Sequence, residues 1–192
     1  MARQVGNVTV ECVVGDIVQQ RDLDAVVNAA NAELMSGGGV AGAIHRTAGP
    51  GLADECRPMA PIEPGQAVIT SGHDMPNPYV IHCLGPVYGV DEPAAGKLAS
   101  CYLEGLRVAD EHGLTGVGFP ALSTGAFGYP IEEAAKVAVP TVLKAAERLN
   151  TVRLVRFVLP NDKALNIHNK VLLDTACDGD LNSALAPNVR RP

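Results

Sequence analysis

Apolar residues follow two different periods along this chain, and the change from one period to the other separates predicted strands from predicted helices. Short apolar runs bounded by Gly, Pro, Asn or Asp are typical of buried strands, and apolar residues at every third or fourth position are typical of helices. The strand pattern covers residues 8–14, 24–28, 67–70, 79–84, 116–119 and 153–159. The helix pattern covers residues 40–48, 51–56, 92–112, 131–149 and 162–173. The connector between the third and fourth of these strands contains Pro and Asn and suits a hairpin-like link.

The periodic pattern stops after Asp174. Residues 175–192 show no apolar period, so we expect a mobile C-terminal tail there. The chain has 192 residues in all, and a domain averages about 150 residues. We therefore expect a single domain over residues 1–174.

The most informative stretch is the connection between the second predicted strand and the first predicted helix. It contains Gly37, Gly38 and Gly39 in succession, directly before the helix. Three residues without Cβ can turn their N–H groups towards one point, and the helix start adds unpaired N–H groups and a positive dipole end. This favours an anion site, with phosphate as the obvious anion. A tight strand-to-helix connection explains the glycines equally well, and the stretch has neither the P-loop nor the G-x-G-x-x-G pattern.

Two asparagines lie on either side of a pair of alanines where that strand ends. Open α/β sheets bind ligands at the carboxyl ends of their strands, and an amide holds a sugar hydroxyl or a water through both donor and acceptor. Asn28 and Asn31 are therefore candidate ligand contacts. The alternative is a turn capped by Asn.

A second turn, residues 120–130, repeats the design of the first. It reads PALSTGAFGYP, follows a short apolar strand and precedes a helix pattern that begins at Ile131. Two such loops side by side are able to grip a pyrophosphate from both faces.

Charge narrows the ligand class. The net charge is −6 and the isoelectric point is about 5.3, and Lys and Arg form no run longer than Arg190 and Arg191. A protein that grips duplex nucleic acid normally shows a basic face. A small nucleotide held by backbone amides therefore fits better than a nucleic acid.

Location and metal binding follow from what the sequence lacks. No apolar run approaches the ~20 residues of a membrane span, and the N-terminus lacks the order of a signal peptide, so we expect a cytoplasmic protein. The five cysteines have no C-x-x-C spacing, which favours reduced, buried thiols over a disulfide frame or a zinc site. No cluster has metal-ligand spacing, so we expect no metal. His45 and His82 are better explained as hydrogen-bonded structural histidines than as acid–base groups.

Four motifs in this order resemble those of the macrodomain family. They are NAAN at residues 28–31, GGGVAGAI at 37–44, VIHCLGP at 80–86 and FPALSTGAFGYP at 119–130, and the similarity extends from about residue 8 to residue 173. The resemblance, nearest to the MacroD-like branch that processes ADP-ribose derivatives, implies a three-layer α/β/α fold around a mixed sheet. It also implies a cleft for ADP-ribose at the carboxyl ends of the strands.

The resemblance also assigns roles to individual residues. Asp16 resembles the carboxylate that accepts from the adenine amino group, although a turn or helix-cap aspartate is the alternative. Asn31 resembles the residue at the distal ribose, and Phe127 the aromatic that packs on that ribose, where a hydrophobic plug is the alternative. Asn31 and Gly39 are the expected catalytic positions. The expected ligand-binding residues are Asp16, Ile17, Asn28, Ala30, Asn31, Gly37, Gly38, Gly39, Val40, Ala41, Ser123, Thr124, Gly125, Ala126 and Phe127.

Two positions depart from the family pattern. Ala41 stands where hydrolases of this branch commonly carry an Asp that orients or deprotonates water. Where an aromatic often covers the adenine after the last strand, the local sequence here is Leu159-Pro160-Asn161-Asp162. We therefore hold two hypotheses. The chain is a hydrolase of mono-ADP-ribosylated protein or O-acetyl-ADP-ribose, or it is a reader that binds ADP-ribose without turnover. RNA binding is disfavoured by the charge, and we expect a monomer that needs no cofactor.

Overall fold

A computed structural model describes the backbone of residues 1–183 and the side chains of residues 1–175. Seven strands form one mixed sheet in the order β1-β2-β7-β6-β3-β5-β4. The five inner strands run parallel, and β1 and β4 pair antiparallel with their neighbours at the two edges. The strands are β1 (Ala2–Val5), β2 (Val8–Val14), β3 (Ala25–Ala29), β4 (Ala67–Ser71), β5 (Tyr79–Cys83), β6 (Gly116–Phe119) and β7 (Leu154–Leu159).

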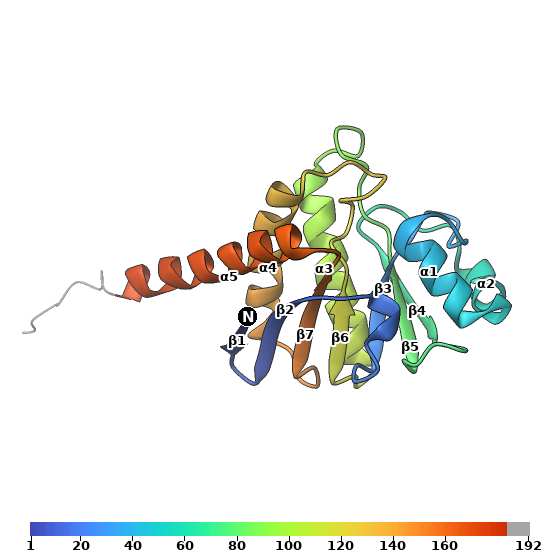
Figure 1. Ribbon diagram of the computed structural model, residues 1–192, viewed down its shortest axis with the longest axis horizontal. Coiled ribbons are helices and arrows are strands. Elements are labelled where there is room, and N and C mark those ends of the chain that lie inside the picture. The colour runs from blue at the N-terminus through green and yellow to red at the C-terminus, as the bar shows by residue number, and fades with distance from the viewer. Residues whose placement is uncertain (184–192) are drawn as a thin grey trace, which may run out of the picture.

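Helices cover both faces of the sheet, which gives the expected three-layer α/β/α fold (Figure 1). They are α1 (Gly39–Ala48), α2 (Pro50–Cys56), α3 (Ala94–Glu111), α4 (Ile131–Ala146) and α5 (Asp162–Ser183). Two short 3-10 helices, η1 (Ile17–Gln19) and η2 (Arg57–Met59), follow β2 and α2. One apolar core lies between the sheet and α3, α4 and α5, and it includes Leu98, Tyr102 and Phe157. A smaller one lies beneath α1 and α2 and includes Ile44 and Leu52.

The central strands are apolar on both sides because helices cover both sides. All four residues of β6 and the first four of β3 are buried. This explains why their sequences read as largely apolar runs, in which Asn28 is the one polar side chain. The expected antiparallel link between residues 67–70 and 79–84 is confirmed by the pairing of β4 with β5.

Two predictions about the ends of the chain need correction. Strand β1 was not predicted. Its residues are alternately exposed and half-buried, and the strand is held by backbone pairing with β2. The predicted end of the last helix near Leu173 is wrong, since α5 continues to Ser183. The missing apolar period reflects a helix that runs on beyond the body of the domain (Figure 1). Residues 184–192 of the expected tail lie outside the described residues.

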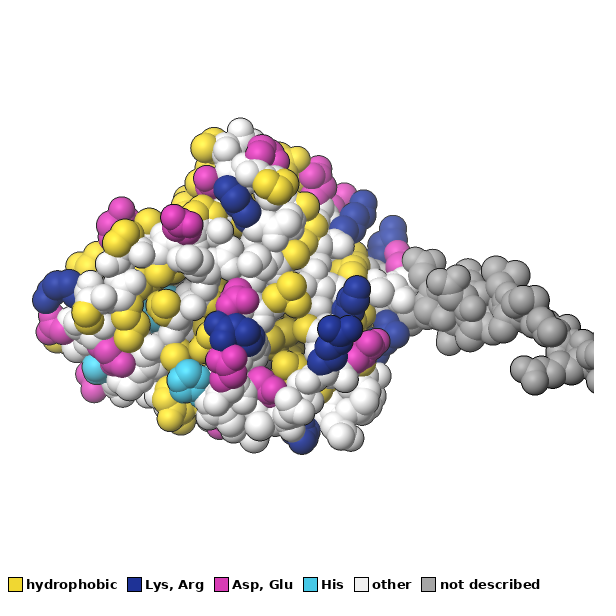
Figure 2. Space-filling view, turned by 180° about the vertical axis from the view of Figure 1, so that it is seen from behind, with side chains coloured by type: hydrophobic (Ala, Val, Ile, Leu, Met, Phe, Trp, Pro, Cys, Tyr) yellow, Lys and Arg dark blue, Asp and Glu magenta, His cyan; other side chains and the backbone are white. Residues whose placement is uncertain are grey.

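The described surface mixes charges of both signs. On the face seen in Figure 2, Lys and Arg side chains lie among Asp and Glu side chains rather than in one basic patch. Among the described residues, Arg107 forms ion pairs with Glu104 and Glu111. Within the described residues, no helix combines the length and apolar character needed to cross a membrane.

Candidate functional site: a cleft at the carboxyl ends of the parallel strands

A cleft of about 740 Å³ opens where the parallel strands end, a size within the ~300–1,000 Å³ usual for small-molecule sites. Its wall includes residues that directly follow β2, β3, β6 and β7, namely Gly15, Ala30, Pro120 and Pro160. The full lining is Gly15, Asp16, Ile17, Ala29, Ala30, Asn31, Gly37, Gly38, Gly39, Val40, Ala41, Ala43, Pro120, Ala121, Ser123, Thr124, Gly125, Ala126, Phe127, Val158 and Pro160. Fourteen of the fifteen expected ligand-binding residues are therefore brought together, and Asn28 is the exception.

The glycine turn forms one wall of the cleft and leads directly into α1. Gly38 is extended, with φ −83° and ψ 176°, and Gly39 has φ +55°, a conformation that favours glycine. Gly42 packs so closely against the carbonyl of Gly37 that a side chain there would clash. No side chain caps α1, so the N–H groups of its first turn remain available to a ligand in the cleft.

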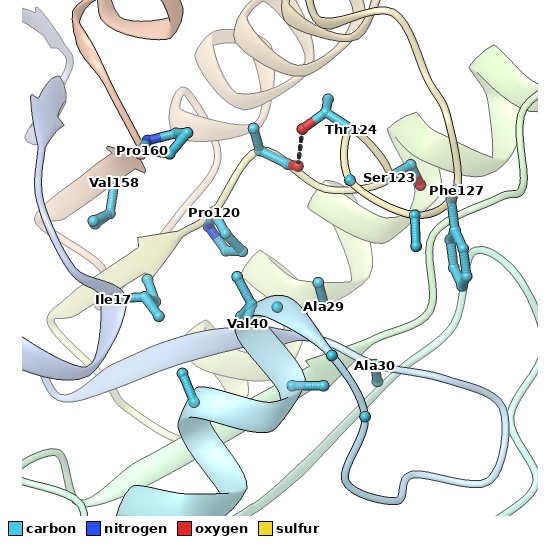
Figure 3. A pocket seen from close by; sticks show the side chains of 18 of the residues that line it. Ile17, Ala29, Ala30, Val40, Pro120, Ser123, Thr124, Phe127, Val158 and Pro160 are labelled. Atoms are coloured by element: carbon cyan, nitrogen blue, oxygen red, sulfur yellow. Dashed lines mark hydrogen bonds between the residues drawn. The ribbon is translucent and has the colours of Figure 1, made fainter.

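The second loop forms the opposite wall. Ser123 adopts φ +65°, and its carbonyl accepts from the Tyr129 N–H at 3.0 Å. Thr124 Oγ1 donates to the carbonyl of Ala121 at 2.8 Å, which closes the loop on itself (Figure 3). Gly125 has open space where a side chain would begin. Ser123 Oγ is buried against Gly85 and has no hydrogen-bond partner within the described residues.

Asp16 is the helix cap that the sequence offered as the alternative, and it also lies in the wall of the cleft. Its Oδ1 accepts from the Val18 N–H at 3.1 Å and caps η1, and the residue also lines the cleft. No bond within the described residues uses Oδ2, which leaves that oxygen to accept from a ligand donor.

An apolar platform lies beside Asp16. Ile17, Val158 and Pro160 lie together at one end of the cleft, and Phe127 lies at the other (Figure 3). Pro160 stands at the position where the sequence analysis expected an aromatic and found none. The flat ring face of proline, with two aliphatic side chains, gives a base an apolar surface without a second aromatic ring.

Asn31 has a structural role as well as a place in the lining. Its Nδ2 donates to the Met35 carbonyl at 2.9 Å, and its Oδ1 accepts from the Met35 N–H at 3.0 Å. The amide therefore closes the loop between β3 and the glycine turn. Its second N–H proton and second lone pair remain for a ligand or a water.

Asn28 lies beneath the cleft rather than in it. It is fully buried, and its Nδ2 donates to His82 Nδ1 at 3.1 Å. With this amide orientation, His82 carries its proton on Nε2 and donates to Thr70 Oγ1 at 2.9 Å. Burial lowers the pKa of His82 to about 3, so the ring is neutral. Alternate residues of a strand face opposite ways. The sequence alone does not tell whether an Asn near the end of β3 faces the core or the cleft.

His45 is also a buried residue outside the lining. It is 7% exposed, and its Nε2 has no protein partner within the described residues. Burial lowers its pKa. Neither of the two candidate histidines lines the cleft. The hydrogen bonds expected of both are present for His82, whereas His45 Nε2 makes none within the described residues.

The electrostatic character of the cleft is unusual for a phosphate site. None of its lining residues is Lys, Arg or His, and Asp16 is the one carboxylate among them. An anion here must be held by N–H groups, hydroxyls and the dipole of α1. Ala41, 5% exposed, lies in the first turn of α1.

Seven of the lining residues were not among the expected ligand contacts. They are Gly15, Ala29, Ala43, Pro120, Ala121, Val158 and Pro160. Most lie at or just beyond a strand end. Their side chains carry no chemical feature that sets them apart. Their positions at strand ends are the available signal, because α/β sheets bind ligands there.

Similar proteins carry the same domain. The family model for the macro domain matches residues 27–138. The macro domain-containing protein CT2219 of Chlorobaculum tepidum is 42% identical over 167 residues, which cover 86% of this chain and 96% of that protein. The macro domain-containing protein SCO6450 of Streptomyces coelicolor is 46% identical over 149 residues, which cover 74% of this chain and 88% of that protein.

Solved structures agree in fold. The Oceanobacillus iheyensis macrodomain with ADP superimposes with a TM-score of 0.87 at 35% identity, covering 93% of this chain and 97% of that chain. The Trypanosoma brucei macrodomain in complex with ADP-ribose gives a TM-score of 0.78 at 34% identity, covering 84% of this chain and 68% of that one. With the strand order, the two converging loops and these relatives taken together, the chain belongs to the macro domain family.

Proposed function

We propose that this chain binds ADP-ribose in the cleft and hydrolyses ADP-ribosyl derivatives, in the manner of the MacroD-like branch. The observation that carries the proposal is that two loops with free backbone N–H groups line one cleft from opposite sides. The helix-capping carboxylate of Asp16 lies at one end of this cleft, and the side chains of Asn31 and Phe127 lie at the other. The chemistry of ADP-ribose matches this order. A base fits beside Asp16, the diphosphate between the loops, and the distal ribose beside Asn31 and Phe127.

The adenine end supplies specificity. Oδ2 of Asp16 accepts from the exocyclic amino group while Ile17, Val158 and Pro160 cover the ring. A hydrogen bond to a charged group contributes about 1.5 to 3 kcal/mol. The platform adds the burial of apolar ring surface, at about 25 cal/mol per Å².

The diphosphate end supplies orientation. The residues at the start of α1 and those of the loop around Gly125 line the same cleft, so their backbone N–H groups are the donors available to a diphosphate there. Fixed N–H dipoles stabilise a dianion without the large desolvation cost of buried ammonium groups.

The hydrolytic step takes place at the distal ribose. For a mono-ADP-ribosylated protein, water adds its oxygen to the anomeric carbon, the bond to the acceptor side chain breaks, and the two water protons end on the new hydroxyl and the leaving group. For O-acetyl-ADP-ribose, water adds to the ester carbonyl carbon, the bond from that carbon to the ribose oxygen breaks, the ribose oxygen takes a proton, and acetate and ADP-ribose leave. Asn31 and the loop at Gly39 place the ribose and the water, and the ligand's own diphosphate helps to orient the water.

A second candidate function rests on Ala41. No carboxylate lies among the lining residues near the expected distal ribose, so a general base of the usual kind is missing. A reader that holds ADP-ribosylated protein without turnover fits this observation.

One experiment separates the two functions. The protein is incubated with mono-ADP-ribosylated protein and, separately, with O-acetyl-ADP-ribose, and free ADP-ribose is followed with time, while calorimetry measures ADP-ribose affinity. A hydrolase of this design releases ADP-ribose at a modest rate, with little change between pH 6 and 8, because neither His nor Cys is among the lining residues. Binding without release identifies the reader, and the absence of binding removes both candidates.

A further inference from the structure

Arg156 lies on the strand that supplies the base platform. Side chains that are two apart along a strand share a face of the sheet, and in β7 this places Arg156 on the same face as Val158, which lines the cleft. The guanidinium is largely buried, with 14% of its side chain exposed. It therefore sits behind the part of the cleft where we expect the base.

The guanidinium is held by three side chains. Nε donates to Glu11 Oε1 at 2.6 Å, and Glu11 is its direct partner on the neighbouring strand β2. NH1 and NH2 donate to the two carboxylate oxygens of Asp22 at 2.8 Å each. NH1 also donates to Gln20 Oε1 at 2.9 Å. These contacts fix the planar guanidinium of Arg156. Gln20 accepts one of the hydrogen bonds that it donates.

Gln20 passes this constraint to Asp16. Its Nε2 donates to the carbonyl of Asp16 at 2.8 Å, so a single amide joins Arg156 to the residue at the base end of the cleft. Asn77, 1% exposed, holds the far side of the same turn by donating to the carbonyls of Gln20 and Leu23 at 2.7 and 2.8 Å. The turn that carries Asp16 is thus tied down from β7 and from the segment before β5.

We propose that Gln20 and Arg156 are positioning residues that set the Asp16 carboxylate for recognition of an amino-bearing base, and that they determine base selectivity without touching the ligand. This inference rests on the proposed binding of ADP-ribose. The helix η1 has three residues and so contributes few backbone bonds of its own. Without the Gln20 amide, the Asp16 carbonyl keeps its bond from the Gln19 N–H and Oδ1 keeps its bond from the Val18 N–H, but the turn loses its tie to Arg156 on β7. The Asp16 carboxylate then shifts with the turn relative to Val158 and the expected base.

The test measures selectivity rather than affinity alone. Calorimetry compares ADP-ribose with the analogue whose base is hypoxanthine, which presents a carbonyl in place of the amino group. We expect the wild type to prefer ADP-ribose by roughly ten- to a hundredfold, the range of one charge-assisted hydrogen bond. Gln20→Ala should reduce the preference to about threefold or less, and Asp16→Ala should do the same. The double variant should show no further loss, because both substitutions remove one interaction.

Two further variants separate positioning from stability. Gln20→Glu keeps an acceptor for Arg156 but has no donor for the Asp16 carbonyl, so it should lose selectivity as Gln20→Ala does. Glu11→Gln weakens the ion pair of Arg156 and leaves the Gln20–Asp16 bond intact, so it should lower the thermal midpoint and retain the preference. Thermal unfolding of each variant shows whether it is folded.

The outcomes distinguish this inference from the proposed function. A wild type that does not bind ADP-ribose overturns the proposed function. A wild type that binds both ligands equally, or folded Gln20 variants that keep the wild-type preference while unfolding at lower temperature, overturn the positioning role and leave ADP-ribose binding intact.

Discussion

The side chain of Asn31 and the backbone of Met35 exchange two hydrogen bonds, at 2.9 and 3.0 Å, across the loop that leads from β3 to the glycine turn. The amide therefore mimics a backbone pair and shapes the loop that we expect beside the distal ribose. A substitution of Asn31 therefore changes the loop conformation as well as any contact of Asn31 with the substrate.

Asn31→Ala should lower turnover by one to two orders of magnitude and ADP-ribose affinity by less than about tenfold, because most ligand contacts lie on the two diphosphate loops. Hydrogen exchange at residues 32–37 should become faster, since both bonds to Met35 are lost. Single-turnover kinetics, calorimetry and exchange on one preparation measure the three effects. Equal losses in turnover and affinity would show that Asn31 contributes uniform binding only.

The second loop is tested at Gly125. Its missing side chain leaves open space next to the expected diphosphate. Gly125→Glu should abolish detectable ADP-ribose binding, because the new side chain enters that space and sets a negative charge against the phosphates. Gly125→Ala is the matched control and should keep affinity within a few-fold, since a methyl group meets no atom within 4 Å. Strong binding by the Glu variant would place the diphosphate elsewhere.

The fold could be predicted from sequence where the signal was local. Apolar runs located the inner strands, and the glycines at 37–39 and the small-residue loop at 120–127 located both walls of the cleft. β1 was missed because an edge strand with polar exposed residues is stabilised by the chain that it pairs with. Pairing of this kind leaves no pattern in the strand's own sequence.

The site was predictable to the same extent and for the same reason. Loops that bind a ligand through backbone N–H groups are recognisable by their glycines. Whether a side chain is buried or lines the cleft depends on residues that are far away in the sequence. Asn28 turned out to be a buried partner of His82, 54 residues away, and Pro160 turned out to line the apolar end of the cleft. The network that runs from Arg156 through Gln20 to Asp16 spans more than one hundred residues of sequence, and no local pattern indicates it.

The lack of cations in the cleft predicts a weak dependence of binding on salt. Screening reduces attraction between ionic groups over about 8 Å at physiological ionic strength, but N–H groups in direct contact with a phosphate are affected little. We expect ADP-ribose affinity to fall by less than about threefold between 50 and 500 mM NaCl, as measured by calorimetry. A fall of tenfold or more would mean that Lys or Arg side chains outside the described lining carry the phosphate contact.

The buried His82 predicts that the protein loses stability in mild acid. Its pKa is lowered to about 3 in the folded state by burial, against about 6.5 for an exposed histidine. The unfolded chain therefore binds more protons between these values. The free energy of unfolding is unaffected by this residue above about pH 6.5 and falls as pH drops towards 3, at up to ~1.4 kcal/mol per pH unit.

His82→Gln tests this contribution. The amide keeps a donor and an acceptor for Asn28 and Thr70 but does not titrate, so the variant should be less stable at pH 7.5 and show a shallower loss between pH 6 and 4. Urea unfolding at several pH values gives both slopes. His45 and His168, whose pKa values burial also lowers, keep some slope in the variant, and an unchanged slope would show that His82 does not carry the effect.

Ala41 offers the sharpest test of catalysis, because its place in the fold suits a carboxylate. It lies in the first turn of α1 and lines the cleft, where the helix dipole favours a negative charge by about 0.3 to 1 kcal/mol. Ala41→Asp should therefore fold with near wild-type stability, bind ADP-ribose more weakly through repulsion of the diphosphate, and release ADP-ribose from a modified protein faster by supplying a group that orients or deprotonates water. Ala41→Asn is the matched control, since it has the same shape without the charge, and it should orient water without acting as a base. If the wild type turns over and Ala41→Asp is no faster, the natural site already places its water well, and the ligand's diphosphate is sufficient. If the wild type shows no release and activity appears only in Ala41→Asp, the hydrolase proposal fails and the protein is a reader built on a hydrolase scaffold.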